Sequence, residues 1–343
     1  MKSRVGIIGS TGYTGVVLTK LLLEHPNVQI TLLTSEQHSG KYYYEVYPSF
    51  YEKTNLKCTK FSINNIARLC DIVFFATPND FASTYAPKLL SKNKNIKIID
   101  LSADFRLKTK LKIKNNITNI AYGLPELHRN EIKNSSLIAN PGCYPTSILL
   151  GLTPALKKKI IHEDSIVCDS KSGVTGAGKG VKQELHFTEI NESFTAYKLG
   201  GTHRHISEIE NEISKLLPNK RSIKITFSPH LLPINRGILS TIYADLKSKK
   251  ISQNDIYRLY KNYYKNECFI KVLPHTIYAQ TKNVRYTNFC HITPIIDKRT
   301  NKLIVISAID NMVKGASGQA VQNMNIILSL KESVGLDSLA QIP

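Results

Sequence analysis

The chain has 343 residues, a length that accommodates about two domains of ordinary size. Hydrophobic residues make up 42% and charged residues 21% of it, which is the balance of a globular protein. No apolar run reaches the ~18 residues of a membrane-spanning helix, and the N-terminus enters a strand-like run at once, so we expect neither a membrane span nor a signal peptide. The six cysteines form no CxxC pair and have no histidine at metal-binding spacing, which predicts a reduced, cytoplasmic protein without a metal site.

The net charge of +20 results from 46 Lys and Arg against 26 Asp and Glu. A charge of this size would suit a nucleic-acid-binding protein. The excess is mostly Lys, however, and it is spread through the whole chain instead of forming a basic arm. We therefore expect small anionic molecules as partners, and neither a nucleic acid nor a membrane.

The first half of the chain alternates strands with helices. A continuous apolar run at 4–9 predicts a buried parallel strand, and the helix after it carries its apolar residues at helical spacing. Such alternation predicts an α/β domain with an open parallel sheet. Further strands are expected at 28–33, 71–76, 96–101 and 136–139, and further helices at 63–69, 80–91 and 147–156.

Beyond about residue 160 the pattern changes to that of an α+β domain, with an antiparallel and half-exposed sheet. A last helix is expected at about 313–331, and no flexible linker separates the two halves, which predicts two closely packed domains. Strands are expected at 165–170, 223–228, 238–245, 289–296 and 303–309, and helices at 205–217 and 252–264.

A glycine-rich turn joins the first strand to the first helix. Glycines in this place let the backbone approach a pyrophosphate, whose charge the helix N-terminus favours, so the turn predicts a dinucleotide site. Its spacing is GxxGxxG, a departure from the commoner GxGxxG. The predicted cofactor-binding residues are Gly9, Ser10, Thr11, Gly12, Tyr13, Thr14 and Gly15.

The end of the second strand bears on which dinucleotide binds. Thr34 and Ser35 are small hydroxyl residues that suit a 2′-phosphate, which favours NADP(H), with Ser35 as a cofactor ligand. Glu36 is a carboxylate near the position where NAD-binding proteins place one, so NAD stays open as an alternative.

Cys143 follows Pro141 and Gly142 where a strand leads into a helix. The field at a helix N-terminus stabilises a thiolate, which a nucleophilic cysteine requires. The other five cysteines lie in or beside apolar segments and are expected to be inert. Cys143 is therefore the candidate nucleophile.

Two further segments are candidates for the same site. His203, Arg204 and His205 follow a glycine-led turn at a predicted helix start, and two histidines in this setting predict a proton-transfer group, with either ring possible. The glycine-rich segment 171–179 does not meet the P-loop pattern, but its N–H groups and Lys179 could line an anionic pocket.

At these residues the sequence resembles the N-acetyl-γ-glutamyl-phosphate reductases, an NADP-dependent family of arginine biosynthesis, over essentially its full length. Related aspartate-semialdehyde dehydrogenases typically carry Asn before the cysteine, where this chain has Gly142. Another departure is Ser207, where the family usually has Pro. The matching segments are GSTGYTG (9–15), DLSADFR (100–106), YGLPE (122–126), NPGCYPTSILLGLTP (140–154), GTHRHISEIE (201–210), PHLLPINRGI (229–238) and DNMVKGASGQAVQNMN (310–325).

The resemblance implies an α/β Rossmann dinucleotide-binding domain, residues 1–145 completed by a C-terminal helix within 313–343. It implies a glyceraldehyde-3-phosphate-dehydrogenase-like α+β catalytic and dimerisation domain at 146–312, and a homo-oligomer, dimer or tetramer. It assigns Cys143 as nucleophile and His203 as acid/base. Asn311, Gly315 and Gly318 would lie near the nicotinamide, and the expected ligands of the acyl-phosphate substrate are Arg106, Asn140, Lys179 and Arg236.

In the implied mechanism the Cys143 thiolate attacks the γ-acyl phosphate and phosphate departs. The thioester accepts hydride from NADPH, and His203 protonates the oxyanion before the semialdehyde is released. One alternative is another acyl-phosphate reductase of this fold, acting on aspartyl or aminoadipyl phosphate, because one methylene is worth only ~1–3 kcal/mol in a pocket. A distant alternative is a basic, nucleotide-responsive protein that binds nucleic acid.

Overall fold

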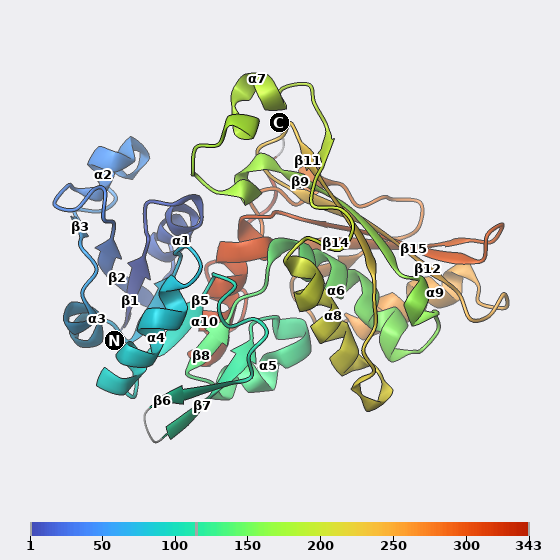
Figure 1. The fold of residues 1–343 in the computed structure, drawn as a ribbon, viewed down its shortest axis with the longest axis horizontal. Coiled ribbons are helices and arrows are strands. Elements are labelled where there is room, and N and C mark those ends of the chain that lie inside the picture. The colour runs from blue at the N-terminus through green and yellow to red at the C-terminus, as the bar shows by residue number, and fades with distance from the viewer. Residues whose placement is uncertain (1, 114–115, 342–343) are drawn as a thin grey trace. The chain divides into compact units, whose positions relative to one another are not determined.

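The computed structural model describes residues 2–113 and 116–341. The chain forms two compact units, which we describe separately (Figure 1). The first unit consists of Met1–Pro141 with Ala316–Asp337, and the second of Gly142–Gly315 with Ser338–Pro343. The domain limits expected from the sequence, 1–145 with 313–343 and 146–312, stay a prediction.

The first unit is built on an eight-stranded sheet in the order β3-β2-β1-β4-β5-β8-β7-β6. Neighbouring strands are parallel except for the β6–β7 pair, and the order 3-2-1-4-5 is that of a doubly wound sheet. The predicted open parallel sheet is confirmed. The strands are β1 (Ser3–Ile8), β2 (Val28–Thr34), β3 (Cys58–Thr59), β4 (Ile72–Phe75), β5 (Lys97–Asp100), β6 (Lys110–Ile113), β7 (Asn116–Tyr122) and β8 (Leu137–Ala139).

Helices cover this sheet in two groups. Helix α10 packs against α1 and α5, while α3 packs against α4. Ile66 of α3 and Leu89 of α4 share one core with Phe75 of β4, and all three side chains are fully buried. Apolar faces at helical spacing thus bury the continuous apolar strands between them. The helices are α1 (Tyr13–Leu23), α2 (Tyr43–Val46), α3 (Ile63–Leu69), α4 (Phe81–Lys92), α5 (Pro125–Asn134) and α10 (Gly318–Ile327).

The second unit contains a seven-stranded sheet in the order β10-β11-β9-β12-β15-β14-β13. The antiparallel sheet expected from the sequence is found in four of the six strand pairs, whereas β11 pairs with β9 and β13 with β14 in parallel. Between β9 and β11 the chain passes through α8, the kind of crossover that parallel neighbours need. The strands are β9 (Val167–Gly173), β10 (Thr195–Ala196), β11 (Thr226–Leu232), β12 (Ile238–Asp245), β13 (Ile270–Val272), β14 (Cys290–Asp297) and β15 (Lys302–Ile309).

Helix α6 packs on β12 and β15 at one face of this sheet. Gly151 permits the close approach, because a Cβ atom there would lie 2.8 Å from Cδ1 of Ile242. This packing positions α6 on the sheet, and Cys143 is the first residue of that helix. The helices of this unit are α6 (Cys143–Lys157), α7 (Phe187–Ile190), α8 (His205–Leu216) and α9 (Gln253–Tyr263).

Several elements differ from their expected limits. The expected helix at 147–156 begins four residues earlier, at Cys143. The expected last helix, 313–331, is a π-type turn at Val313–Ser317 followed by the shorter α10. The β6–β7 hairpin was not expected, because its Lys- and Asn-rich residues acquire strand pairing only from their neighbours. In the part of the chain that the structure describes, no helix is long and apolar enough to cross a membrane.

Candidate active site

The three glycines of the turn between β1 and α1 are required for different structural reasons. Gly9 has φ 78°, and a Cβ atom there would lie 2.5 Å from the carbonyl oxygen of Ala76. A Cβ atom at Gly15 would lie 2.3 Å from the Gly9 oxygen. At Gly12, with φ −76°, a Cβ atom would meet only that oxygen, at 3.7 Å. The protein interior explains Gly9 and Gly15, whereas Gly12 suits a backbone that a pyrophosphate approaches.

The turn that leads into α1 is fixed by the hydroxyl groups of two tyrosines. Gly12 is the N-cap residue, and no side chain caps the helix. The Tyr43 hydroxyl donates to the Ser10 carbonyl at 2.8 Å, and the Tyr47 hydroxyl donates to the Thr11 carbonyl at 2.6 Å. First-turn N–H groups lack acceptors within their own helix and attract anions. Tyr43 and Tyr47 lie about 30 residues beyond the motif, and the sequence analysis missed them.

Ser35 lies beside this turn. Its hydroxyl shares a hydrogen bond of 2.8 Å with that of Thr11, and the preceding Thr34 carbonyl accepts from Ser10 N at 2.9 Å. The Glu36 carboxylate accepts the backbone N–H of Phe61 at 2.9 Å. Glu36 is therefore engaged with its own chain, while a hydroxyl stands next to the glycine-rich turn.

Two predicted substrate ligands of the first unit serve its internal structure. Arg106 is 8% exposed, and its guanidinium donates to the Asn140 carbonyl at 2.9 Å and the Leu101 carbonyl at 3.0 Å. The Asn140 amide donates to the Ala316 carbonyl and accepts from Asn323, both at 3.1 Å. These bonds connect the ends of β5 and β8 with the start of α10, and the ligand roles stay predictions.

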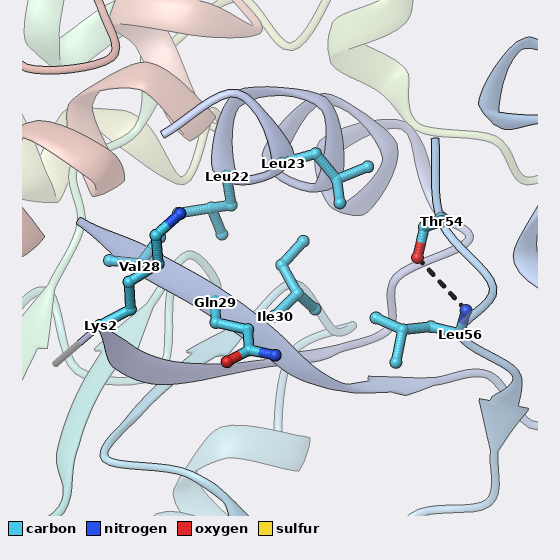
Figure 2. A pocket seen from close by; sticks show the side chains of 8 residues that line it. All are labelled: Lys2, Leu22, Leu23, Val28, Gln29, Ile30, Thr54 and Leu56. Carbon is cyan, nitrogen blue, oxygen red and sulfur yellow. Dashed lines mark hydrogen bonds between the residues drawn. The ribbon is translucent and has the colours of Figure 1, made fainter. Parts of the chain in front are cut away.

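A recess of about 380 Å³ in the first unit lies apart from these residues (Figure 2). Most of the side chains that line it are aliphatic. The dashed line in Figure 2 is the hydrogen bond that the Leu56 backbone N–H donates to the Thr54 hydroxyl, at 3.2 Å. The recess contains none of the predicted site residues, and we assign it no part in catalysis. It is lined by Lys2, Leu22, Leu23, Val28, Gln29, Ile30, Thr54 and Leu56.

Cys143 is the first residue of α6 and is partly exposed, whereas the following residues of the helix, through Leu156, are buried. The N-cap residue is Gly142, and no side chain caps the helix. The Gly142 backbone N–H donates to the buried carboxylate of Glu208 at 2.8 Å, which fixes the helix start. A sulfur at this position lies in the favourable field of the helix terminus.

The turn after β15 packs directly against the cysteine. A Cβ atom at Gly315 would lie 2.8 Å from Cβ of Cys143, so only glycine fits there without displacement. Asp310 is fully buried and organises the turn: its carboxylate accepts from the N–H groups of Met312 and Val313, and its carbonyl accepts from Gly315 at 2.9 Å. Gly315 thus has a steric role beside the nucleophile.

Arg236 and Asn311 adjoin this turn. The Arg236 guanidinium lies 3.6 Å from the Asp310 carboxylate and 4.7 Å from the centre of the Tyr286 ring. Asn311 is 2% exposed, accepts from Gly237 N at 2.8 Å and donates to the Thr175 hydroxyl at 3.0 Å. The structure therefore brings these residues together with Cys143 and Gly315 in the second unit.

His203 is 8% exposed and lies one residue before the N-cap of α8. Its Nδ1 accepts the backbone N–H of His205 at 3.1 Å, so the neutral ring carries its proton on Nε2. Burial lowers the pKa of His203 to about 4, and the positive charges of Lys198 and Arg204 act in the same direction. A second proton on Nδ1 would also face an N–H donor. The ring is therefore a neutral donor at physiological pH.

Aromatic rings connect the histidines with the cysteine segment. The Tyr144 ring lies 5.8 Å from that of His203 and 6.0 Å from that of His205. The Tyr197 ring lies 5.6 Å from that of His203, and its hydroxyl donates to the Tyr144 hydroxyl at 3.2 Å. Burial raises the pKa of both phenols, that of Tyr197 to about 12. Lys179 lies exposed beyond a short turn at Val174–Ala177, and its ligand role stays a prediction.

Comparison with known proteins identifies the family to which the chain belongs. Residues 4–135 match the family described as semialdehyde dehydrogenase, NAD binding domain, and residues 143–311 match semialdehyde dehydrogenase, dimerisation domain. The N-acetyl-gamma-glutamyl-phosphate reductase of Clostridium botulinum (strain Eklund 17B / Type B) is 48% identical, with 98% of each chain covered. That of Desulfotalea psychrophila is 47% identical, with 99% of each covered. This chain belongs to the N-acetyl-gamma-glutamyl-phosphate reductase family.

Solved structures share the fold of this reductase family member at low identity. Aspartate semialdehyde dehydrogenase II from Vibrio cholerae is 17% identical, with a TM-score of 0.75 over 96% of this chain and 99% of that one. Aspartate semialdehyde dehydrogenase with NADP from Candida albicans is 16% identical, with a TM-score of 0.73 over 97% of this chain and 100% of that one. The predicted pairing of a Rossmann domain with an α+β domain is confirmed.

The predicted site residues of this reductase fall into two sets. Gly9–Gly15, Ser35, Arg106 and Asn140 belong to the first unit, and the others belong to the second. Within residues 2–113 and 116–341, no group of three or more His, Cys, Asp or Glu is arranged to hold a metal ion. Glu208 and Tyr197 are further candidate site residues, which contact Gly142 and His203 respectively and which the sequence analysis missed. Glu208 lies in the segment GTHRHISEIE, whose resemblance to the family was the one sequence feature that could have pointed to this residue.

Proposed function

We propose that this chain catalyses the NADPH-dependent reduction of N-acetyl-L-glutamyl 5-phosphate to N-acetyl-L-glutamate 5-semialdehyde and phosphate. The reaction is a step of arginine biosynthesis in the cytoplasm, and the protein acts as a homo-oligomer. The observation that carries the proposal is a partly exposed cysteine at an uncapped helix N-terminus, packed against Gly315, in a chain 48% identical to a reductase of this name. Phosphate-dependent oxidation of N-acetylglutamate semialdehyde with NADP tests it.

The first unit fits the dinucleotide. The uncapped start of α1 and the unobstructed Gly12 would receive the pyrophosphate, and Ser35 would contact the 2′-phosphate. The bound cofactor supplies hydride equivalents to an acyl carbon.

Cys143 provides the covalent step. Its thiolate attacks the acyl carbon, the C–O bond to phosphate breaks, and phosphate leaves with the electron pair. The thioester accepts hydride more readily than a carboxylate would. Collapse of the resulting oxyanion breaks the C–S bond, so the aldehyde departs and Cys143 returns as a thiolate.

His203 stabilises the oxyanion in this proposal. With Nδ1 engaged and a pKa of about 4, the ring offers Nε2–H as a hydrogen-bond donor to the oxyanion, and the acid/base role expected from the sequence stays a prediction. Since collapse regenerates the thiolate, hydride transfer and collapse together need no net proton, and the one proton that the overall reaction consumes goes to the departing phosphate. The guanidinium of Arg236, held beside Asp310, and the exposed Lys179 would attract the anionic substrate.

A second candidate is reduction of aspartyl phosphate, which the shared fold with aspartate semialdehyde dehydrogenases favours. The two substrates differ in chain length and in the N-acetyl group. Comparing kcat/KM for oxidation of the two semialdehydes distinguishes them, and a higher value for aspartate semialdehyde would reject the first proposal.

Gly12 and Gly15 form a matched pair that tests the cofactor site. We expect Gly12→Ala to keep the parental melting temperature and to raise the NADPH Kd at least ~10-fold, because the new methyl group would occupy the approach of the pyrophosphate. Gly15→Ala should instead destabilise the fold by about 1–3 kcal/mol, because its methyl group would overlap the Gly9 carbonyl. Fluorescence titration and thermal unfolding measure both effects. Unchanged binding in Gly12→Ala would contradict the assignment.

We also expect a preference for NADPH over NADH in kcat/KM. The hydroxyl of Ser35 lies beside the turn, while Glu36 is engaged by the Phe61 N–H. Ser35→Asp should reduce this preference at least ~10-fold, because a carboxylate repels a 2′-phosphate and accepts from a ribose hydroxyl. Equal efficiency of the parent with both cofactors would instead assign Glu36 to the ribose.

A further inference from the structure

The His203 ring is enclosed by four other aromatic side chains of the second unit. The ring centres of His205 and Phe227 lie 4.8 Å and 5.3 Å from that of His203. Those of Tyr144 and Tyr197 lie 5.8 Å and 5.6 Å from it. All but the His205 contact are edge to face, an arrangement that is favourable for aromatic rings and fixes their orientation. We call these four side chains the cage.

One wall of the cage comes from a surface segment. Three of its members lie in α6, β11 and α8 and are at most 6% exposed. Tyr197 instead belongs to the segment 194–200, in which every other residue is exposed. Its backbone N–H donates to the Pro229 carbonyl at 3.1 Å, and its hydroxyl donates to the Tyr144 hydroxyl at 3.2 Å. Tyr197 is therefore the wall of the cage that can be removed without disturbing the core.

We propose that Tyr197 is a positioning residue: its ring closes the cage over His203, holds the histidine in one orientation and excludes water from it. The ring carries this role, because it is the part of Tyr197 that lies against His203, whereas the hydroxyl donates to Tyr144. The effect on turnover rests on the proposed function, in which the Nε2–H group of His203 donates to the oxyanion.

The charges beside the cage oppose protonation of the enclosed histidine. Burial is the largest cause of the low pKa of His203, about 4, and the positive charges of Lys198 and Arg204 act in the same direction. Both charges remain if the Tyr197 ring is removed. Opening the cage should therefore reduce the contribution of burial and raise the pKa of His203 toward its ordinary value of about 6.5, without reaching it.

The phenols of the cage are neutral and lie near the nucleophile. Burial raises the pKa of the Tyr197 phenol to about 12 and also raises that of Tyr144. A negative charge on Cys143 raises the pKa of both phenols further, so they lie within the electrostatic range of its sulfur. The other two walls are the uncharged Phe227 and the ring of His205. Tyr197 thus lies near both groups that the proposed reaction uses.

The test compares Tyr197→Ala and Tyr197→Phe with the parent. The matched control is Tyr278→Ala, the same change at a tyrosine of the second unit that is 56% exposed. Nuclear magnetic resonance titration of the histidine rings measures the pKa of His203, whose signal is the one lost in His203→Asn. Tyr197→Ala should raise this pKa by at least about one unit, whereas Tyr197→Phe and Tyr278→Ala should keep the parental value. Circular dichroism and thermal unfolding establish that each variant is folded.

Activity gives a second measurement. In Tyr197→Ala, kcat for oxidation of the semialdehyde should fall at least about 10-fold, the scale of displacing a group that stabilises the transition state. Its ratio of kcat/KM at pH 5 to that at pH 7 should be at least about twofold below the parental ratio, because more of the His203 rings are protonated at pH 5. Tyr197→Phe should restore most of the activity and the parental ratio.

The outcomes separate the cage from the reaction. A parental His203 that titrates near pH 6.5, or a folded Tyr197→Ala with the parental pKa, would overturn closure of the cage. A raised pKa with parental kcat would overturn the positioning role, and equal losses in Tyr197→Ala and Tyr197→Phe would assign that role to the hydroxyl instead of the ring. The titration needs neither cofactor nor substrate. If it shows the closed cage but the parent does not oxidise the semialdehyde, the proposed function fails and the cage stands.

Discussion

Cys143→Ser is expected to lower turnover on the order of 10⁴-fold or more, the scale of losing a catalytic nucleophile. Serine places a hydroxyl where the thiolate stands, and the helix terminus cannot ionise a hydroxyl at neutral pH. NADPH binding should change less than about twofold, because the residues proposed to hold the cofactor belong to the first unit. Steady-state rates with phosphate and NADP, together with NADPH titration, measure the two effects.

Cys268→Ser is the matched control, since Cys268 is an exposed cysteine outside the site. It should keep parental activity and cofactor affinity. Burial raises the pKa of the thiol of Cys70 to about 11 and also raises that of Cys168, which leaves these sulfurs protonated and unreactive. A Cys143→Ser enzyme with parental turnover would exclude the covalent mechanism.

His203→Asn is expected to lower kcat by about 10²–10⁴-fold, the range for loss of a proton-transfer or oxyanion-stabilising group. In the parent, the limb of the kcat/KM profile that belongs to His203 should lie near pH 4, well below the ordinary histidine pKa of about 6.5. Titration of His203 should therefore cause no change in kcat/KM between pH 5 and 8. Rates measured against pH for parent and variant check both points.

The same pKa has a consequence for stability. The native ring binds its proton only below about pH 4, whereas the ring of the unfolded chain binds it below about pH 6.5. Between these values the unfolded state holds more protons, so the free energy of unfolding decreases as pH falls from 6.5 to 4. His203→Asn should lose this dependence, which urea unfolding at several pH values measures.

His205→Asn is the comparison that separates the two histidines. The His205 backbone N–H, which donates to His203 Nδ1, remains in the variant. Its ring is 6% exposed and packs near Tyr144, so the substitution should mainly lower stability or raise KM. A larger kcat loss in His205→Asn, with a parental profile in His203→Asn, would reverse the assignment. If neither variant loses activity, another group stabilises the oxyanion.

The sequence by itself determined the elements whose residues carry a local signal. Strand β12 lies at the expected 238–245, and α3 at the expected 63–69, because their apolar residues recur at periods that only one backbone conformation can bury. The glycine-rich turn and the Cys143 helix start were also visible, since both depend on backbone geometry within a few residues. Family membership followed from motifs spread over the chain, and the comparisons confirm it.

Only the tertiary structure decided what depends on residues far apart in the chain. The β11–β9 pair is parallel because of a crossover through α8, which strand periodicity does not encode. Gly315 needs to be glycine because Cys143, more than 170 residues earlier, packs against it. The low pKa of His203 results from burial and nearby positive charges, and its tautomer from one backbone N–H. The burial of a residue and its contacts depend on which residues surround it in space, and these neighbours come together only when the chain folds.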